Sequence, residues 1–355
     1  MKKNFFFLIA LCAAIMAMPF LTSCNDDDDP TEKPEITAEY IYVLNSGNMN
    51  NNNATLSMYD VEKETVTRDI FEVQNGRRLG DTGQDMVIYG GKIYIAMYGE
   101  STVEVTDLEA KSIKQIKTEG QPRSFAVYGG KVYVTYFNGY VARIDTASLE
   151  IEAKVQVGRN PEQMAIASNK LYVANSGGLD YNTEAGYDKT VSVINLASFT
   201  EIKKIEVVIN PSEMESDNRG NVYIISKGNY ADVPNTLQKL NSETDEVSVM
   251  EGIDGTFFTT AGNILYSVYS QWGTDDIYYY SYDATGNTVL SDNFIGDIQI
   301  SSPYQINYDA DYEHLFITTS DWINDGDVYI FNKSIQFINK FEAGLNPIKV
   351  TGIKR

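Results

Sequence analysis

The sequence predicts an all-β protein, a seven-bladed β-propeller of four-stranded antiparallel blades, closed by the C-terminal strand pairing into the N-terminal blade. Three observations lead to this prediction. Short segments rich in Val, Ile and Tyr alternate with Gly, Asn and Asp, one pattern repeats along the chain, and the incomplete units at the two ends complement each other. No segment has the periodicity expected of an amphipathic helix.

A repeated pattern marks the start of each blade. A Pro is followed by two polar residues and an apolar residue, and an aromatic residue comes eight to ten positions after the apolar one. Clear copies begin at Pro122, Pro161, Pro211 and Pro303, and weaker copies begin at Gly83 and Gly255. The aromatic residues are expected to anchor the second strands in the core: Tyr42, Tyr94, Tyr133, Tyr172, Tyr223, Tyr266 and Phe316. Their spacings of 39 to 52 residues are typical of propeller blades.

The remaining strands follow from the same pattern. The apolar first-strand residues are expected to pack between neighbouring blades: Met86, Phe125, Met164, Met214, Phe258, Ile306 and Val350. Third strands are expected at Val103–Asp107, Val141–Asp145, Val191–Asn195, Leu237–Asn241, Ile277–Asp283 and Val328–Asn332. Fourth strands follow, as at Ile113–Lys117 and Ile202–Val207. Gly90-Gly91, Gly129-Gly130 and Ser168-Asn169 have the composition of two-residue turns between first and second strands.

The two chain ends predict how the ring closes. The N-terminal unit has an aromatic strand at Ile41–Leu44, a third strand at Thr55–Asp60 and a fourth at Thr65–Phe71, but it has no Pro-led first strand. The C-terminal segment Asn346–Ile353 supplies such a strand, with no further strands after it. Pairing of these two parts completes a seventh blade and removes an open sheet edge.

The first 39 residues are expected to be a targeting segment and a linker rather than part of the folded domain. Residues 1–23 read as a lipoprotein signal peptide, because a basic start precedes an apolar run that is too short to span a bilayer. Leu21-Thr-Ser-Cys24 resembles a bacterial lipobox, so Cys24 is expected to carry lipid. Residues 24–39 then form an acidic linker, residues 40–355 form the propeller, and the single mature cysteine excludes an intrachain disulfide.

Composition excludes several classes of function. The formal net charge of −21 argues against nucleic acid as a partner, because phosphate binding requires a surplus of Lys and Arg. The single histidine, His314, excludes multi-His metal sites and is expected to be solvent-exposed or structural. Neither a phosphate-binding loop nor a serine nucleophile motif is present, so no catalytic residue and no metal ligand is predicted. The 25 tyrosines favour a binding surface.

Candidate ligand-binding residues are expected on one face of the ring. The connections from second to third strands open on the same face as the loops that enter the first strands, and they are long and aromatic. Long loops on a rigid scaffold commonly carry binding residues. The candidates are Arg77, Tyr98, Arg123, Tyr136, Phe137, Asn160, Tyr181, Tyr187, Tyr230, Trp272, Tyr304 and Trp322. For any single tyrosine, the alternative is that it packs one loop onto another.

Leu171-Tyr-Val-Ala-Asn175 and Val191-Ser-Val-Ile-Asn195 resemble the YVTN-type repeat of YncE-like propellers, and the resemblance covers residues 40–355. With the lipobox and the acidic run Asp26–Asp29, which resembles the export signal of surface lipoproteins in Bacteroidetes, the chain is similar to the BtuG type of vitamin B12-binding lipoproteins. That resemblance implies a lipid-anchored protein at the cell surface. It also implies capture of cobalamin or other corrinoids and their transfer to a TonB-dependent, BtuB-like transporter in the outer membrane.

Two other functions remain open at this stage. Tryptophan and tyrosine side chains also stack on sugar rings, so the same face is compatible with a surface glycan-binding protein. The ring is also compatible with a protein-docking module that takes no small ligand. An enzymatic role is not expected, and the transported cobalamin is the only cofactor-like molecule implied.

Overall fold

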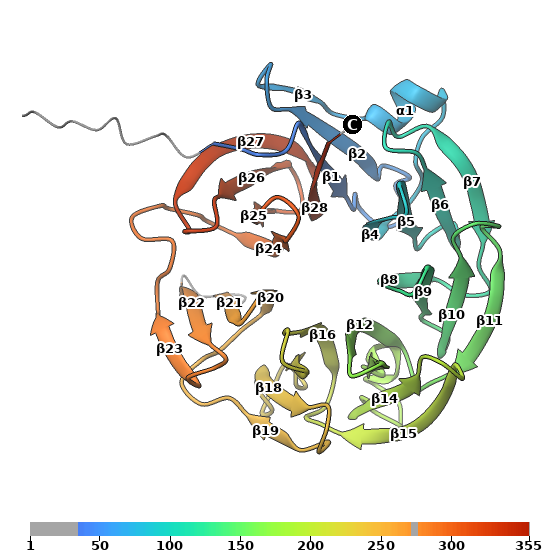
Figure 1. The fold of residues 1–355 in the computed structure, drawn as a ribbon, viewed down its shortest axis with the longest axis vertical. Coiled ribbons are helices and arrows are strands. Elements are labelled where there is room, and N and C mark those ends of the chain that lie inside the picture. Colours follow the sequence, from blue (N-terminus) through green and yellow to red (C-terminus); the bar gives the residue numbers. More distant parts are fainter. Residues whose placement is uncertain (1–34, 271–275, 355) are drawn as a thin grey trace, which may run out of the picture. The chain divides into compact units, whose positions relative to one another are not determined.

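Seven four-stranded antiparallel sheets lie around a common axis, with the first strand of each sheet nearest the centre (Figure 1). The computed structural model describes residues 35–270 and 276–354. The predicted seven-bladed propeller is confirmed. Blades are numbered here from the N-terminus, and the strands of each are given from the centre outward.

Blade 1 contains β28 (Pro347–Ile353), β1 (Tyr40–Asn45), β2 (Thr55–Asp60) and β3 (Thr65–Thr67). Blade 2 contains β4 (Gly83–Tyr89), β5 (Lys92–Met97), β6 (Thr102–Thr106) and β7 (Ser112–Lys117). Blade 3 contains β8 (Pro122–Tyr128), β9 (Lys131–Tyr136), β10 (Tyr140–Asp145) and β11 (Ile151–Gln156). Blade 4 contains β12 (Pro161–Ala167), β13 (Lys170–Asn175), β14 (Thr190–Asn195) and β15 (Thr200–Glu206).

Blade 5 contains β16 (Pro211–Ser216), β17 (Asn221–Ser226), β18 (Thr236–Asn241) and β19 (Val247–Val249). Blade 6 contains β20 (Phe257–Ala261), β21 (Ile264–Ser270), β22 (Ile277–Asp283) and β23 (Thr288–Ser291). Blade 7 contains β24 (Pro303–Asp309), β25 (His314–Thr319), β26 (Asp325–Phe331) and β27 (Phe337–Leu345). The predicted third strands therefore match to within a few residues.

The ring closes through the C-terminal strand, as predicted. Strand β28 pairs antiparallel with β1 and places Val350 opposite Val43 (Figure 1). Arg68, which follows β3, forms ion pairs with Asp325 and Glu342 of blade 7. Closure therefore joins the two ends of the chain by a backbone ladder and adds charged contacts near the outer strands.

Blade 1 contains the main departure from the predicted strands. The predicted fourth strand at Thr65–Phe71 ends at Thr67, and a short helix, α1 (Ile70–Asn75), follows it. The Asp69 carboxylate accepts a hydrogen bond from the Glu72 backbone N–H, and Gly76 ends the helix with a φ of +64°. Ile70 and Phe71, the apolar residues that suggested the end of a strand, are instead the buried residues of this helix.

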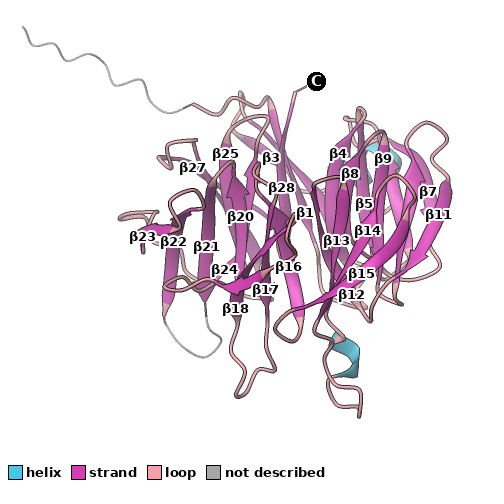
Figure 2. Cartoon of the chain, turned by 60° about the horizontal axis from the view of Figure 1, so that its bottom comes forward, coloured by secondary structure: helices cyan, strands magenta, loops and turns pink. Residues whose placement is uncertain are grey.

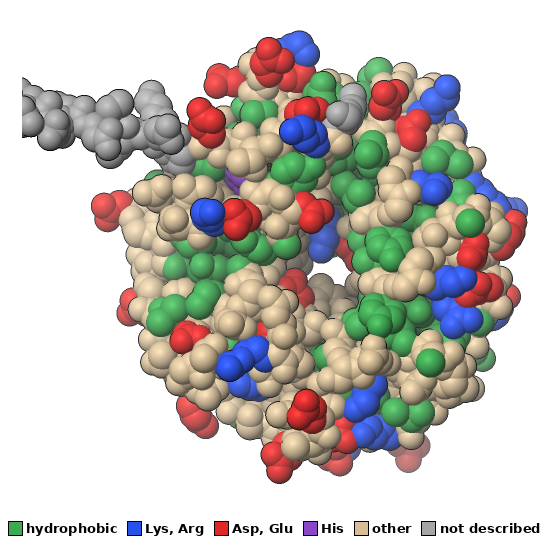
Figure 3. All heavy atoms as spheres, in the orientation of Figure 1, with side chains coloured by type: hydrophobic (Ala, Val, Ile, Leu, Met, Phe, Trp, Pro, Cys, Tyr) green, Lys and Arg blue, Asp and Glu red, His purple; other side chains and the backbone are tan. Residues whose placement is uncertain are grey.

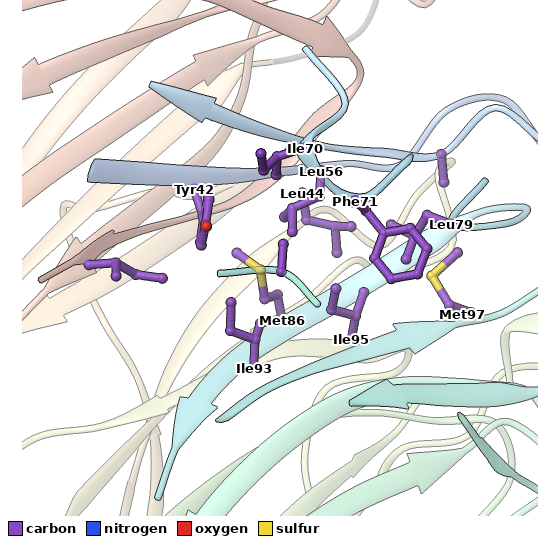
Figure 4. Close-up of a cluster of buried hydrophobic side chains, with 13 residues drawn as sticks. Tyr42, Leu44, Leu56, Ile70, Phe71, Leu79, Met86, Ile93, Ile95 and Met97 are labelled. Carbon is purple, nitrogen blue, oxygen red and sulfur yellow. The ribbon is translucent and has the colours of Figure 1, made fainter. Parts of the chain in front are cut away.

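The core lies between neighbouring blades. The seven aromatic anchors and the seven apolar first-strand residues are each at most 8% exposed, which confirms both predictions. Figure 4 shows one such interface, where Tyr42 and Leu44 of blade 1 pack against Met86 and Ile95 of blade 2. Burial of each such side chain contributes about 1.5–3 kcal/mol to folding.

Polar first-strand residues also join neighbouring blades. The Asp85 carboxylate accepts hydrogen bonds from the Ser124 hydroxyl and the Phe125 N–H of the next blade. In the same way, the Gln163 side-chain carbonyl accepts from the Met214 N–H, and that of Asn307 accepts from the Val350 N–H. These bonds hold the walls of the central channel in a fixed relation to one another.

His314 is buried, with 2% of its surface exposed, so the structural alternative holds and solvent exposure does not. It begins β25 and its Nδ1 donates to the Tyr312 carbonyl at 2.5 Å. Its ring lies roughly parallel to that of Phe316, with 6.2 Å between centroids. This histidine therefore supports the blade from within.

Candidate ligand-binding face

The longer loops lie on one side of the ring, opposite the C-terminus (Figure 2). This side is called the loop face here. It carries the described connections between second and third strands, at residues 46–54, 98–101, 137–139, 176–189, 227–235 and 320–324. Residues 271–275 of the remaining connection lie outside the described part of the chain. The loops that enter the first strands open on the same side, because strand direction alternates within each blade.

A pocket of about 440 Å³ opens at the centre of the loop face. The starts of the first strands supply polar walls, and loop residues Met49 and Trp322 form part of its rim. A second pocket of about 280 Å³ lies on the opposite face, and Glu215 lines both. The opening at the centre of the ring is visible in Figure 3, with charged side chains of both signs around it. The loop-face pocket has the size of many small-molecule sites.

Arg123 is fixed in the wall of this pocket. Its Nε donates to Glu162 at 2.8 Å, its guanidinium also donates to Gln84, and the ring of Phe137 lies 4.8 Å from the guanidinium carbon. The ring centroid of Tyr98 lies 5.8 Å from the same guanidinium carbon. The structure therefore brings three predicted residues, Tyr98, Arg123 and Phe137, into one cluster with a rigid cation.

Three glutamates give the pocket an acidic wall. Glu162 pairs with Arg123, and Glu213 accepts a hydrogen bond from Gln163 and lies 3.5 Å from Lys227. Glu215 accepts from the Thr260 backbone N–H at 2.7 Å. Burial raises the pKa of both Glu162 and Glu215, because the channel hydrates their charges poorly.

Trp322 and Tyr304 form an aromatic pair at the pocket rim. Their ring centroids are 5.2 Å apart and the rings are nearly perpendicular, at 78°. Trp322 is 51% exposed, while burial raises the pKa of Tyr304 to about 12. The Asn48 side chain donates to the Trp322 carbonyl, which ties the β1–β2 loop to the β25–β26 loop. The pair offers an exposed indole that is backed by a fixed phenol.

Three predicted tyrosines form a second aromatic group on the same face. Tyr187 lies 6.5 Å from Tyr181 within one loop and 6.5 Å from Tyr230 in the loop of the next blade. We call Tyr181, Tyr187 and Tyr230 the tyrosine row. Partial desolvation of its phenol raises the pKa of Tyr230, and nearby charges that include Glu162 and Glu213 raise it further. Lys227, the first residue of the loop that carries Tyr230, lies 3.5 Å from Glu213, so this loop begins at the acidic wall of the pocket.

The 176–189 loop has an internal scaffold that positions this row. Arg159 pairs with Asp180 at 2.5 Å and donates to the Gly186 carbonyl at 2.9 Å. Gly177 has a φ of +60°, and a Cβ there would lie 2.3 Å from the backbone nitrogen of Asp188, so only glycine fits. Asn160 bonds to the Phe137 carbonyl and accepts from Leu179, so this predicted residue joins two loops.

Other predicted residues lie away from the pocket. The Tyr136 side chain is fully buried in the core between blades 2 and 3, so the expectation of a surface position for it was wrong. Arg77 pairs with Glu104, a completely buried residue of β6, and lies outside the lining of the pocket. Trp272 and Cys24 lie outside the described residues.

Some residues that line the pocket were not among the candidates predicted from the sequence. Glu213, Gln305 and Lys349 line the pocket, and each stands two positions after the Pro that begins a first strand. Glu215 stands four positions after its Pro. The spacing from the repeated Pro was therefore the available signal, since alternate strand residues face the channel.

Geometry and fold together define the class of closed seven-bladed propellers, here with a polar central pocket flanked by exposed aromatic side chains, which is consistent with a ligand- or protein-binding role. The chain belongs to the family described as "Domain of unknown function (DUF5074)", whose model matches residues 39–343. No curated protein matches it.

Solved structures share the fold at low identity. Hydrazine synthase from Kuenenia stuttgartiensis is 15% identical with a TM-score of 0.58, over 73% of this chain and 85% of that one. The computationally designed Ika8 protein is 10% identical with a TM-score of 0.57, over 88% and 91%. The Pan2 WD40 domain of Neurospora crassa is 10% identical with a TM-score of 0.52, over 75% and 79%. These similarities concern the fold alone.

Within residues 35–270 and 276–354, no three His, Cys, Asp or Glu side chains are grouped as metal ligands would be. No helix in this part of the chain has the length and apolar character needed to cross a membrane.

Proposed function

We propose that this protein captures a small molecule on its loop face, that the ligand is cobalamin or another corrinoid, and that no chemical step is involved. The observation that carries the proposal is the Trp322–Tyr304 pair, whose indole is exposed at the rim of a polar pocket, with the tyrosine row on the same face. A corrinoid is broad and fringed with amides. Aromatic side chains suit its ring, and Gln84, Gln305 and Arg123 suit its amides.

The rest of the proposal concerns location and transfer. Lipid on Cys24 would hold the protein at the outer surface of the outer membrane, and the ligand would pass to a TonB-dependent, BtuB-like transporter. Support comes from the lipobox-like segment and the acidic run after it. A Cys24→Ala variant is expected to leave the membrane fraction, and protease added to whole cells is expected to digest the wild-type protein. Full protection of the wild-type protein would contradict a surface location.

Calorimetric titration tests the ligand. Saturable binding of cyanocobalamin and no binding of neutral oligosaccharides are expected. Trp322→Ala and Tyr187→Ala should each weaken binding by about 1–4 kcal/mol, because aromatic anchors commonly dominate binding energy. Tyr128→Ala is the matched control, since Tyr128 is 42% exposed beside a narrow turn of the opposite face.

A glycan is the second candidate, and the pocket volume favours it. About 440 Å³ admits one or two sugar rings, whereas a corrinoid would lie across the face with only part of it inside. Saturable binding of an oligosaccharide without binding of cyanocobalamin would replace the first proposal with this one.

A further inference from the structure

We propose that Tyr230 and Trp322 are the two anchors of the ligand, and that strained backbone holds each side chain in place before the ligand arrives. The inference rests on the proposed function and deepens it. The ligand would be a broad molecule with ring groups that contacts blades 5 and 7 at once.

Backbone conformation singles out these two residues. A positive φ is unfavourable for every residue with a Cβ, most of all for bulky ones. Within the described residues, five positions combine a positive φ with a large apolar or aromatic side chain: Leu149, Phe199, Tyr230, Trp322 and Ile335. Tyr230 has a φ of +56° and Trp322 one of +66°.

The other three have a structural reason for this conformation. Leu149, Phe199 and Ile335 all stand in the turns between third and fourth strands. Leu149 and Phe199 are buried in core clusters, and Ile335 packs against one. Burial of the side chain thus offsets the unfavourable backbone at each of these positions.

Tyr230 and Trp322 are not buried in this way. Tyr230 is 75% exposed and Trp322 is 51% exposed, and both lie on the loop face. Unfavourable backbone conformations of this kind persist when surrounding contacts impose them, and they concentrate at functional sites. Ligand binding would account for an exposed aromatic side chain on an unfavourable backbone at both positions.

Short-range hydrogen bonds impose the conformation in both loops. Before Tyr230, the Asn229 side-chain carbonyl accepts from the backbone N–H groups of Ala231 and Val233 at 3.0 and 2.9 Å. Before Trp322, the Asp321 carboxylate accepts from Ile323 and Asn324 at 2.9 and 2.7 Å. The same device, an Asn or Asp one residue earlier, fixes both anchors.

Both anchors are close to the same part of the pocket. Trp322 and Glu213 both line the pocket, and Trp322 contacts Tyr304 there. Lys227, the first residue of the loop that carries Tyr230, lies 3.5 Å from Glu213. The loops that carry the two anchors therefore both reach the acidic wall of the pocket. Anchors that are already fixed lose little conformational entropy on binding.

Stability measurements test the strain. At positions with an ordinary backbone conformation, a Gly variant is less stable than the corresponding Ala variant. At 230 and 322 the order should reverse, with the Gly variant melting about 1–4 °C above the Ala variant, because Gly tolerates a positive φ. Tyr181 is the matched control, since it is an exposed tyrosine of the same face with a φ of −53°. Tyr181→Gly should melt below Tyr181→Ala. If the Gly variant melts below the Ala variant at both 230 and 322, the backbone at these positions is not strained.

Titration with cyanocobalamin tests the anchoring. Tyr230→Gly and Trp322→Gly should each bind at least about tenfold more weakly than wild type while remaining folded. Wild-type affinity in either variant would overturn that anchor and leave the proposed function standing. If wild type binds neither cyanocobalamin nor an oligosaccharide, the proposed function fails and the anchoring fails with it. The melting order still decides the strain in that case.

Discussion

At the residue scale, two arginines with similar sequence settings have different surroundings. Arg77 lies in the segment that leads into β4, and Arg123 is the second residue of β8. Arg123 lines the pocket, held by Glu162 and Gln84. Arg77 points toward β6 and donates two hydrogen bonds, of 2.8 and 2.9 Å, to the Glu104 carboxylate. The Glu104 side chain has no exposed surface. The main role of Arg77 is therefore to neutralise a buried charge.

This assignment predicts the stability of Arg77 variants. Arg77→Ala should lower the free energy of unfolding by about 1–3 kcal/mol, because Glu104 would remain buried with only hydroxyl and amide donors. Adding Glu104→Gln should restore part of the loss, since a neutral amide is less costly to bury than an unpaired carboxylate. Arg78→Ala is the control, because Arg78 is exposed and its guanidinium donates to the Asn52 carbonyl rather than to a buried carboxylate. Urea unfolding gives the values, and equal effects at 77 and 78 would refute the assignment.

At the scale of elements, the turn between third and fourth strands recurs in all seven blades. An Asp or Asn near the end of the third strand accepts hydrogen bonds from backbone N–H groups that follow it. The residues are Asp60, Asp107, Asp145, Asn195, Asn241, Asp283 and Asn332. The positive φ that follows in each turn belongs to Glu64, Ala110, Leu149, Phe199, Asp245, Asn287 and Ile335. The turn is thus a unit of the repeat that the Pro pattern does not include.

The turn makes a prediction at Asn195, whose side-chain carbonyl accepts from Ala197 and Ser198 at 3.0 and 2.9 Å. Asn195→Ala should lower the free energy of unfolding by about 1–2 kcal/mol, because both N–H groups lose their acceptor. Asn195→Asp should change it much less, since a carboxylate has the same acceptors and Asp stands there in other blades. Chemical denaturation compares them. An equal loss in both variants would show that the turn does not depend on this acceptor.

At the scale of the whole molecule, the C-terminal strand closes the ring. Strand β28 contributes Val350 and Ile353 to core clusters of blade 1 and covers the edge of β1. Its Val350 N–H also bonds to Asn307 of blade 7. Closure therefore connects the first and last blades through backbone, core and channel wall together.

Removing β28 should open the ring. A chain that ends at Asn346 should lose cooperative thermal unfolding and self-associate, because β1 becomes an exposed edge and its core partners are lost. A chain that ends at Ile353 keeps the strand and serves as control. Circular dichroism melts and size-exclusion chromatography report the outcome. A monomeric protein with an unchanged midpoint after the longer truncation would show that closure is dispensable.

The sequence by itself determined the blade number, the closing strand and the buried anchors, because each depends on local pattern and on period. It also held a signal for α1 that its apolar residues concealed, namely Asp69 followed three residues later by Glu72. Tertiary structure alone decided that Tyr136 is buried, that Arg77 pairs with a buried carboxylate, and that Tyr230 and Trp322 stand on strained backbone. These properties depend on how distant blades meet around one axis and on how a loop is held by its neighbours, and neither is encoded in a repeat.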